Sequence, residues 1–211
     1  AFEADIIIFN SHHCVNKLID LKAKHQNKLF IQRVDGPMKL YNRISDKRDE
    51  IVYSCNEFIS DGTIYQSSWS KYNSLKMGMK ENVNNIIITN APDKNLFNSF
   101  KKKEFIKSNK IKIVMTSWSK NINKGFLVYK WIDENLDFKN YSVTFVGNSP
   151  IKFKNIVVKL IKDRKKLSDE LKKHDIYLTA SKKDPCSNSL IEALHCKLPA
   201  IALNDGGHVE I

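Results

Sequence analysis

Two carboxylates, Asp184 and Glu192, are separated by seven residues that include Ser187, Asn188 and Ser189. The segment follows a predicted strand and opens a predicted helix, so the backbone N–H groups of these three polar residues would lie at a helix N-terminus. Such a position suits a phosphate. A carboxylate can accept two hydrogen bonds from a vicinal diol, so one could hold ribose and the other a sugar. A capped helix with an incidental glutamate explains the spacing equally well.

A cationic loop is the second feature with chemical potential. Lys124 and Gly125 lie between a predicted strand and a predicted helix. This arrangement places an ammonium group and a helix N-terminus at the carboxyl edge of a parallel sheet, which suits a diphosphate. A Lys-Gly pair is also common in surface loops. Further along the chain, Gly147 and the pair Gly206-Gly207 follow predicted strands, and glycines there allow the backbone to approach a ligand closely.

The elements that must position these residues are short apolar strands that alternate with helices. Strands are expected at residues 6–9, 28–34, 63–66, 85–89, 111–115, 143–146, 156–158, 176–179 and 200–203. Helices are expected around residues 18–23, 51–59, 71–77, 125–136, 165–173 and 187–196. This alternation predicts an α/β fold in which parallel sheets are covered by helices.

The alternation is interrupted once, at a stretch with weak periodicity, a proline and three successive lysines. We therefore expect two Rossmann-like domains, over residues 1–95 and 110–211, joined by a linker at 96–109. Two such halves bind ligands at the carboxyl edges of their strands.

Composition limits the class of protein. No apolar run approaches the roughly 18 residues of a membrane span, and the chain opens without a secretory signal. The four cysteines show no metal or disulfide spacing, which predicts reduced thiols and a cytoplasmic location. The net charge is +12, but 31 of the 35 basic residues are lysines, spread along the chain. We expect no nucleic-acid partner. A further option is that the protein contacts the anionic inner face of the membrane.

The carboxylate segment and the strand after it resemble the E-x7-E region of glycosyltransferase family 4, whose members have the GT-B architecture. The resemblance implies that Asp184 contacts the donor sugar, Glu192 holds the nucleotide ribose, and the backbone of residues 187–189 meets the phosphates. An aspartate replaces the usual first glutamate. The turn at Gly206-Gly207 and the later Glu210 resemble the turn that follows this strand in the family.

The cationic loop resembles the segment whose Arg and Lys neutralise the leaving diphosphate. Lys124 matches the Lys, whereas Ser119 stands at the Arg position and Lys120 could supply the second charge. Gly147 resembles the glycine turn near the nucleotide. Residues 159–164 lie where the family often meets the nucleotide base, but nothing in them reads a specific base, and we interpret Lys162 and Arg164 as surface charges. Trp118 is interpreted as a packing residue.

In the first half, His12, His13, Arg33 and Asp35 resemble loops on the acceptor side and could orient an acceptor or move a proton. The family's opening strand and final helices have no counterpart, so both domains are expected to be incomplete.

The resemblance implies sugar transfer from a nucleoside-diphosphate sugar to an acceptor hydroxyl. It further implies retention of configuration, no metal or other cofactor, and a glycan or lipid-linked acceptor in polysaccharide or glycan biosynthesis. Three alternatives stay open: an inactive nucleotide-binding module, another Rossmann-type enzyme, and a basic nucleic-acid binder. The dinucleotide and nucleoside-triphosphate glycine motifs are both missing, which disfavours the second.

Overall fold

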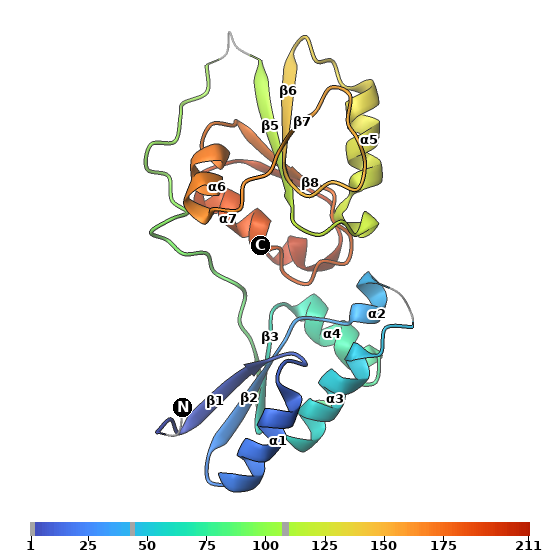
Figure 1. Ribbon diagram of the computed structural model, residues 1–211, viewed down its shortest axis with the longest axis vertical. Coiled ribbons are helices and arrows are strands. Elements are labelled where there is room, and N and C mark those ends of the chain that lie inside the picture. Colours follow the sequence, from blue (N-terminus) through green and yellow to red (C-terminus); the bar gives the residue numbers. More distant parts are fainter. Residues whose placement is uncertain (1–2, 43–44, 107–109) are drawn as a thin grey trace. The chain divides into compact units, whose positions relative to one another are not determined.

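The computed structural model describes residues 3–42, 45–106 and 110–211, and its chain forms two compact units (Figure 1). One unit comprises Ala1–Thr89 with Glu210, and the other Asn90–Val209 with Ile211. Each is a parallel sheet with connecting helices, as the alternation of strands and helices predicts.

The first unit is a four-stranded sheet in the order β1-β2-β3-β4, with every neighbouring pair parallel. Its elements are β1 (Ile6–Asn10), α1 (Val15–Lys24), β2 (Leu29–Val34), α2 (Met38–Tyr41), α3 (Arg48–Phe58), β3 (Gly62–Tyr65), α4 (Ser68–Lys76) and β4 (Asn85–Ile87).

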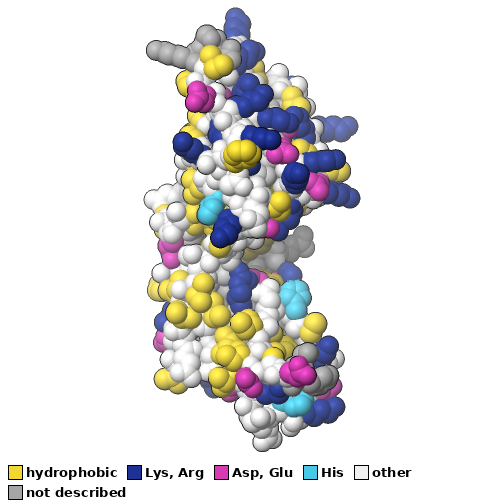
Figure 2. Space-filling model, turned by 90° about the vertical axis from the view of Figure 1, so that its left-hand side faces the viewer, with side chains coloured by type: hydrophobic (Ala, Val, Ile, Leu, Met, Phe, Trp, Pro, Cys, Tyr) yellow, Lys and Arg dark blue, Asp and Glu magenta, His cyan; other side chains and the backbone are white. Residues whose placement is uncertain are grey.

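Side-chain alternation along β1 and β2 decides which face of this sheet is covered. Phe9 and Phe30 are buried in a cluster with Leu18 of α1 and with residues of α3. Ile6 and Ile8, which point to the opposite face, are 52% and 65% exposed. In Figure 2, hydrophobic side chains gather on the unit that carries β1–β4, whereas lysines and arginines are frequent on the other.

The second unit is a five-stranded parallel sheet in the order β7-β6-β5-β8-β9. Its elements are β5 (Ile111–Ser117), a 3₁₀ helix (Ile122–Lys124), α5 (Phe126–Asn135), β6 (Tyr141–Gly147), β7 (Val157–Lys159), α6 (Arg164–Leu171), β8 (Ile176–Thr179), α7 (Asn188–His195), β9 (Ala200–Ala202) and a second 3₁₀ helix (Gly206–Glu210).

Both faces of this second sheet are buried. Val114 of β5 belongs to a core cluster that α6 and α7 complete, whereas its neighbours Ile113 and Met115 belong to another that α5 completes. Successive strand residues point to opposite faces, so β5 is buried on both sides. Figure 1 shows α5 on one side of the sheet and α6 and α7 on the other.

Two local features differ from the expectation. The stretch expected as a linker at 96–109 packs in part on the second unit, because Phe97 is completely buried in its core and Lys102 donates to the carbonyl of His174. Residues 107–109 lie outside the described part. The four-residue helix α2 was not expected. Its first amides, at Met38 and Lys39, donate to the buried carboxylate of Asp49, a cap supplied from α3.

None of the helices in the described ranges is both long and apolar enough to cross a bilayer.

Candidate functional site

A pocket of about 440 Å³ opens in the second unit, where β5, β6 and β8 end. This is the carboxyl edge of a parallel sheet, the edge at which open α/β sheets bind ligands. Its lining consists of Thr116, Ser117, Trp118, Ser119, Lys124, Val146, Lys162, Arg164, Leu167, Thr179, Ser181, Asp184, Cys186, Ser187, Asn188, Ser189 and Glu192. The three residues predicted as catalytic are therefore all in one pocket.

Lys124 is held at the pocket by the turn that follows it. The 3₁₀ helix that ends at Lys124 is capped by Asn121, whose side chain accepts from the amide of Asn123 at 3.0 Å. Gly125 then has a φ of 93°, and a Cβ there would lie 2.7 Å from Ala180, just after β8. Only glycine combines this backbone conformation with such a close approach. The local sequence therefore brings Lys124 next to the end of β8.

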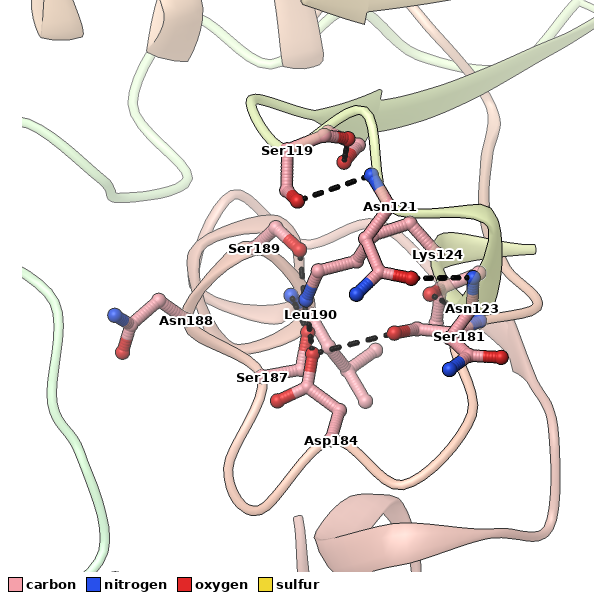
Figure 3. A network of polar contacts seen from close by, with 12 residues as sticks. Ser119, Asn121, Asn123, Lys124, Ser181, Asp184, Ser187, Asn188, Ser189 and Leu190 are labelled. Atoms are coloured by element: carbon pink, nitrogen blue, oxygen red, sulfur yellow. Dashed lines mark hydrogen bonds and ion pairs between the residues drawn. The ribbon is translucent and has the colours of Figure 1, made fainter. Parts of the chain in front are cut away.

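Lys124 and Asp184 form an ion pair across the pocket. The Nζ–Oδ2 distance is 2.8 Å, and the side chains are 25% and 10% exposed. Ser181 Oγ also donates to the same carboxylate oxygen at 3.4 Å. In Figure 3 the ammonium group of Lys124 points toward Asp184. An anion that enters the pocket would meet a cation whose charge Asp184 already offsets.

The Gly206-Gly207 turn supports the backbone of Asp184 and does not line the pocket. The amide of Gly207 donates to the carbonyl of Asp184 at 2.8 Å. Gly206 has a φ of 68°, and a Cβ there would lie 2.4 Å from that carbonyl oxygen. This turn holds the loop that carries Asp184.

The N-terminus of α7 faces the pocket through two serine hydroxyls. Ser187 caps the helix by accepting from the amide of Leu190, and its Oγ lies 3.2 Å from Ser189 Oγ. Asn188 points away from these two in Figure 3, and its Oδ1 accepts from Asn90 Nδ2 at 2.7 Å. All three residues line the pocket, but the side chain of Asn188 is also engaged by Asn90.

Glu192 also lines the pocket, with a side chain that is 16% exposed. Burial raises the pKa of its carboxyl, and the nearby Arg164 opposes that rise. The guanidinium Nη2 of Arg164 is 3.7 Å from Glu192 Oε1, and the group lies over the ring of Phe97 at 5.5 Å. Lys162, which we interpreted as a surface charge like Arg164, also lines the pocket. Two cations thus accompany Lys124.

The remaining donor-side predictions separate into two groups. Ser119 lines the pocket, and so does Trp118, which we had interpreted as a packing residue. Lys120 and Gly147 are not part of the lining. Gly147 instead packs the end of β6 on β5, because its φ is 128° and a Cβ would lie 1.9 Å from the carbonyl oxygen of Ser117.

The acceptor-side candidates gather in the first unit, where β1 and β2 end. The rings of His12 and His13 are stacked with centroids 4.6 Å apart, and Arg33 forms an ion pair with Asp35 at 3.0 Å. Burial lowers the pKa of His12, and the charge of His13 adds to this effect. Asp35 also accepts from the side chain of Gln66. The cluster could hold polar groups, and its histidines could exchange protons.

Sequence reasoning missed the hydroxyl residues at the strand ends: Thr116, Ser117, Thr179 and Ser181. A signal for them existed, because each ends a predicted strand or follows one within two residues, at the carboxyl edge that faces the site. Among the described residues, no group of three or more His, Cys, Asp or Glu side chains is arranged to hold a metal.

No family model matches the sequence, and no curated protein matches it. Solved structures do resemble it. HepE from Anabaena in complex with UDP-glucose superposes with a TM-score of 0.72 at 12% identity, over 98% of this chain and 61% of HepE. Sucrose-phosphate synthase from Thermosynechococcus elongatus gives 0.71 at 16%, over 96% and 57%. A glycosyltransferase from Rickettsia africae gives 0.68 at 17%, over 99% and 60%.

The fold is therefore that of GT-B glycosyltransferases, with two parallel sheets covered by helices, and the prediction of fold class is confirmed. The chain spans about 60% of the length of these proteins. The narrower assignment to glycosyltransferase family 4 stays a prediction.

Proposed function

We propose that the chain is part of a glycosyltransferase that moves a sugar from a nucleoside-diphosphate sugar to an acceptor hydroxyl with retention of configuration, and that its second unit binds the donor. The observation that carries the proposal is the single pocket that contains Lys124, Asp184, Glu192 and the N-terminus of α7. The cation and the helix N-terminus suit the diphosphate of such a donor, and the two carboxylates suit the hydroxyls of its ribose and of its sugar. The likeness in fold to HepE, solved with UDP-glucose, supports the same class.

Departure of the diphosphate is the step that this pocket would favour. Negative charge develops on the leaving phosphate, and preorganised donors in a partly buried site stabilise that charge best. Lys124 and the amides at the start of α7 supply them, with Lys162 as a further cation in the lining. No metal is needed in this scheme, and we propose none.

The two carboxylates would orient the donor. Glu192 would accept hydrogen bonds from ribose hydroxyls, most strongly in its ionised form, and Arg164 favours that form. Asp184 would accept from the transferred sugar while keeping its contact with Lys124. Orientation of this kind lowers the barrier by holding the reacting atoms in place.

The first unit would serve the acceptor, through His12, His13, Arg33 and Asp35. A glycan or lipid-linked acceptor, a role in polysaccharide or glycan biosynthesis, and a cytoplasmic location with contact to an anionic membrane surface complete the proposal. The excess of lysine suits such a surface, because basic groups near anionic lipid are attracted to it.

The test is a thermal-shift panel with UDP, GDP, ADP, CMP and their sugars. Ligand at 100 times its Kd adds about 2.7 kcal/mol, which corresponds to a rise in Tm of roughly 5–10 °C for a chain of this size. We expect one base to give this rise and Glu192→Gln to abolish it. Glu134→Gln, on the exposed side of α5 and paired with Lys130, is the matched control that keeps the rise.

Cooperative melting without a rise for any nucleotide would overturn the proposal. A rise without transfer of labelled sugar to water or to a glycan acceptor would instead identify a nucleotide-binding module without transferase activity.

A further inference from the structure

Tyr177 is a completely buried phenol in the middle of the second sheet. It belongs to β8 and packs in the core cluster that α6 and α7 complete. A phenylalanine would fill the same space without a polar atom. Most buried hydroxyls have hydrogen-bond partners, so the partners of Tyr177 indicate what the phenol does.

Both partners of the phenol line the donor pocket. Tyr177 Oη donates to Ser189 Oγ at 2.9 Å and lies 3.0 Å from Thr116 Oγ1. The phenol has one proton and gives it to Ser189, so Thr116 must be the donor in the second bond. Burial raises the pKa of Tyr177, so the phenol keeps this proton at neutral pH.

The direction of donation continues toward the ligand space. Ser189 Oγ accepts from Tyr177, so its own proton is available to Ser187 Oγ, 3.2 Å away, or to a ligand. Ser187 Oγ already accepts from the amide of Leu190, so its proton too can be given outward. The hydroxyl chain, Thr116–Tyr177–Ser189–Ser187, thus runs from the sheet to the N-terminus of α7, and its first two bonds donate from Thr116 to Tyr177 and from Tyr177 to Ser189.

We propose that Tyr177 is a positioning residue of the donor site: by occupying an acceptor position of Ser189 it directs the Ser189 proton toward the phosphate oxygens of the ligand, either directly or through Ser187. The inference rests on the proposed function, because it places the diphosphate in this pocket. Successive hydrogen bonds polarise one another, and bonds to an anionic acceptor are stronger than neutral ones. The buried phenol would therefore act on a ligand that it does not touch.

The experiment is a double-mutant cycle read by titration calorimetry. Its probes are inorganic pyrophosphate and the nucleoside diphosphate with the largest thermal shift. Tyr177→Phe removes one oxygen and preserves the core, and we expect it to weaken binding of both probes about threefold to tenfold. In the Ser189→Ala background the same change should have no further effect, because the hydroxyl that Tyr177 orients is gone. Tyr141→Phe, at the opposite end of the sheet, is the matched control.

Each outcome of the double-mutant cycle has one interpretation. If Tyr177→Phe weakens probe binding equally in both backgrounds, or does not weaken it at all, the inference is overturned. The proposed function then stands, because the wild-type protein still binds the probes. Wild-type protein that binds neither probe would overturn both. A melting temperature for each variant separates a loss of affinity from a loss of fold.

Discussion

Replacement of Asp184 by asparagine should tighten the binding of a nucleoside diphosphate. Without a ligand, the carboxylate lies 2.8 Å from Lys124 Nζ and offsets the charge that the diphosphate would meet. The substituted asparagine would keep the size of the side chain and the backbone contact with Gly207, which uses the main-chain carbonyl. Lys124, at 25% exposure, can extend its ammonium group to solvent and stay charged.

The size of the effect follows from charge and exposure. Two unit charges 4 Å apart interact by about 1 kcal/mol in water and about 4 kcal/mol at an effective dielectric constant of 20. The proposal places the diphosphate beyond Lys124 as seen from Asp184, in an open pocket, so we take about 1–2 kcal/mol, or roughly 5- to 30-fold in Kd. A nucleotide sugar should not gain, because its sugar loses a bond to a charged acceptor, worth about 1.5–3 kcal/mol.

Titration calorimetry of the wild type and Asp184→Asn with a nucleoside diphosphate and its sugar derivative measures both changes. Asp169→Asn is the control, because it removes the same charge from an exposed position of α6 outside the pocket lining. The gain should shrink in high salt as screening increases. Equal weakening of the two ligands by Asp184→Asn would refute the reasoning, since it would mean that the carboxylate supports the loop and does not compete for Lys124.

Two further outcomes follow from local geometry. Gly125→Ala should cost about 2–4 kcal/mol in urea unfolding, because strain at positive φ adds to the 2.7 Å approach to Ala180. Gly78→Ala, with positive φ and open space, should cost only about 1 kcal/mol; equal losses would contradict this. Burial raises the pKa of Glu192, so its native form binds protons more readily and its contribution to stability falls as pH rises through the glutamate range. Glu192→Gln should flatten that slope and Arg164→Met should extend it to higher pH, both measured by unfolding from pH 4 to 7.5; an unchanged slope would contradict the assignment.

The sequence predicts the elements of the fold well because buried parallel strands are short, nearly continuous apolar runs. The strand expected at residues 176–179 coincides with β8, and the helix expected at 187–196 differs from α7 by one residue at each end. Helix α2 could not be predicted locally, because its cap comes from Asp49 in another helix. Phe97 stands in a polar, weakly periodic stretch, and only packing on the second unit reveals that it belongs to the core.

The candidate site was predicted as far as residue type and spacing allow. Lys124 and Asp184 share a pocket because both follow strand ends at the same sheet edge, and Glu192 joins them from inside the helix that begins there. Lys162 lies in the segment that the resemblance places near the base, but its residues form no specific motif, and the structure shows that it lines the same pocket. Tyr177 lies inside an apolar strand, and the sequence alone does not reveal which residues its hydroxyl bonds to.

The support of Asp184 by Gly206 and Gly207 has a consequence for synthesis on the ribosome. The carbonyl of Asp184 finds its partner only in the amide of a residue that is translated 23 positions later, after β9 has been added at the edge of the sheet. A nascent chain that ends before this turn can form β5 and β6, but the loop carrying Asp184 lacks its anchor. Assembly of the pocket is therefore a late event in translation, because a chain that ends between residues 184 and 206 leaves the loop carrying Asp184 without its anchor.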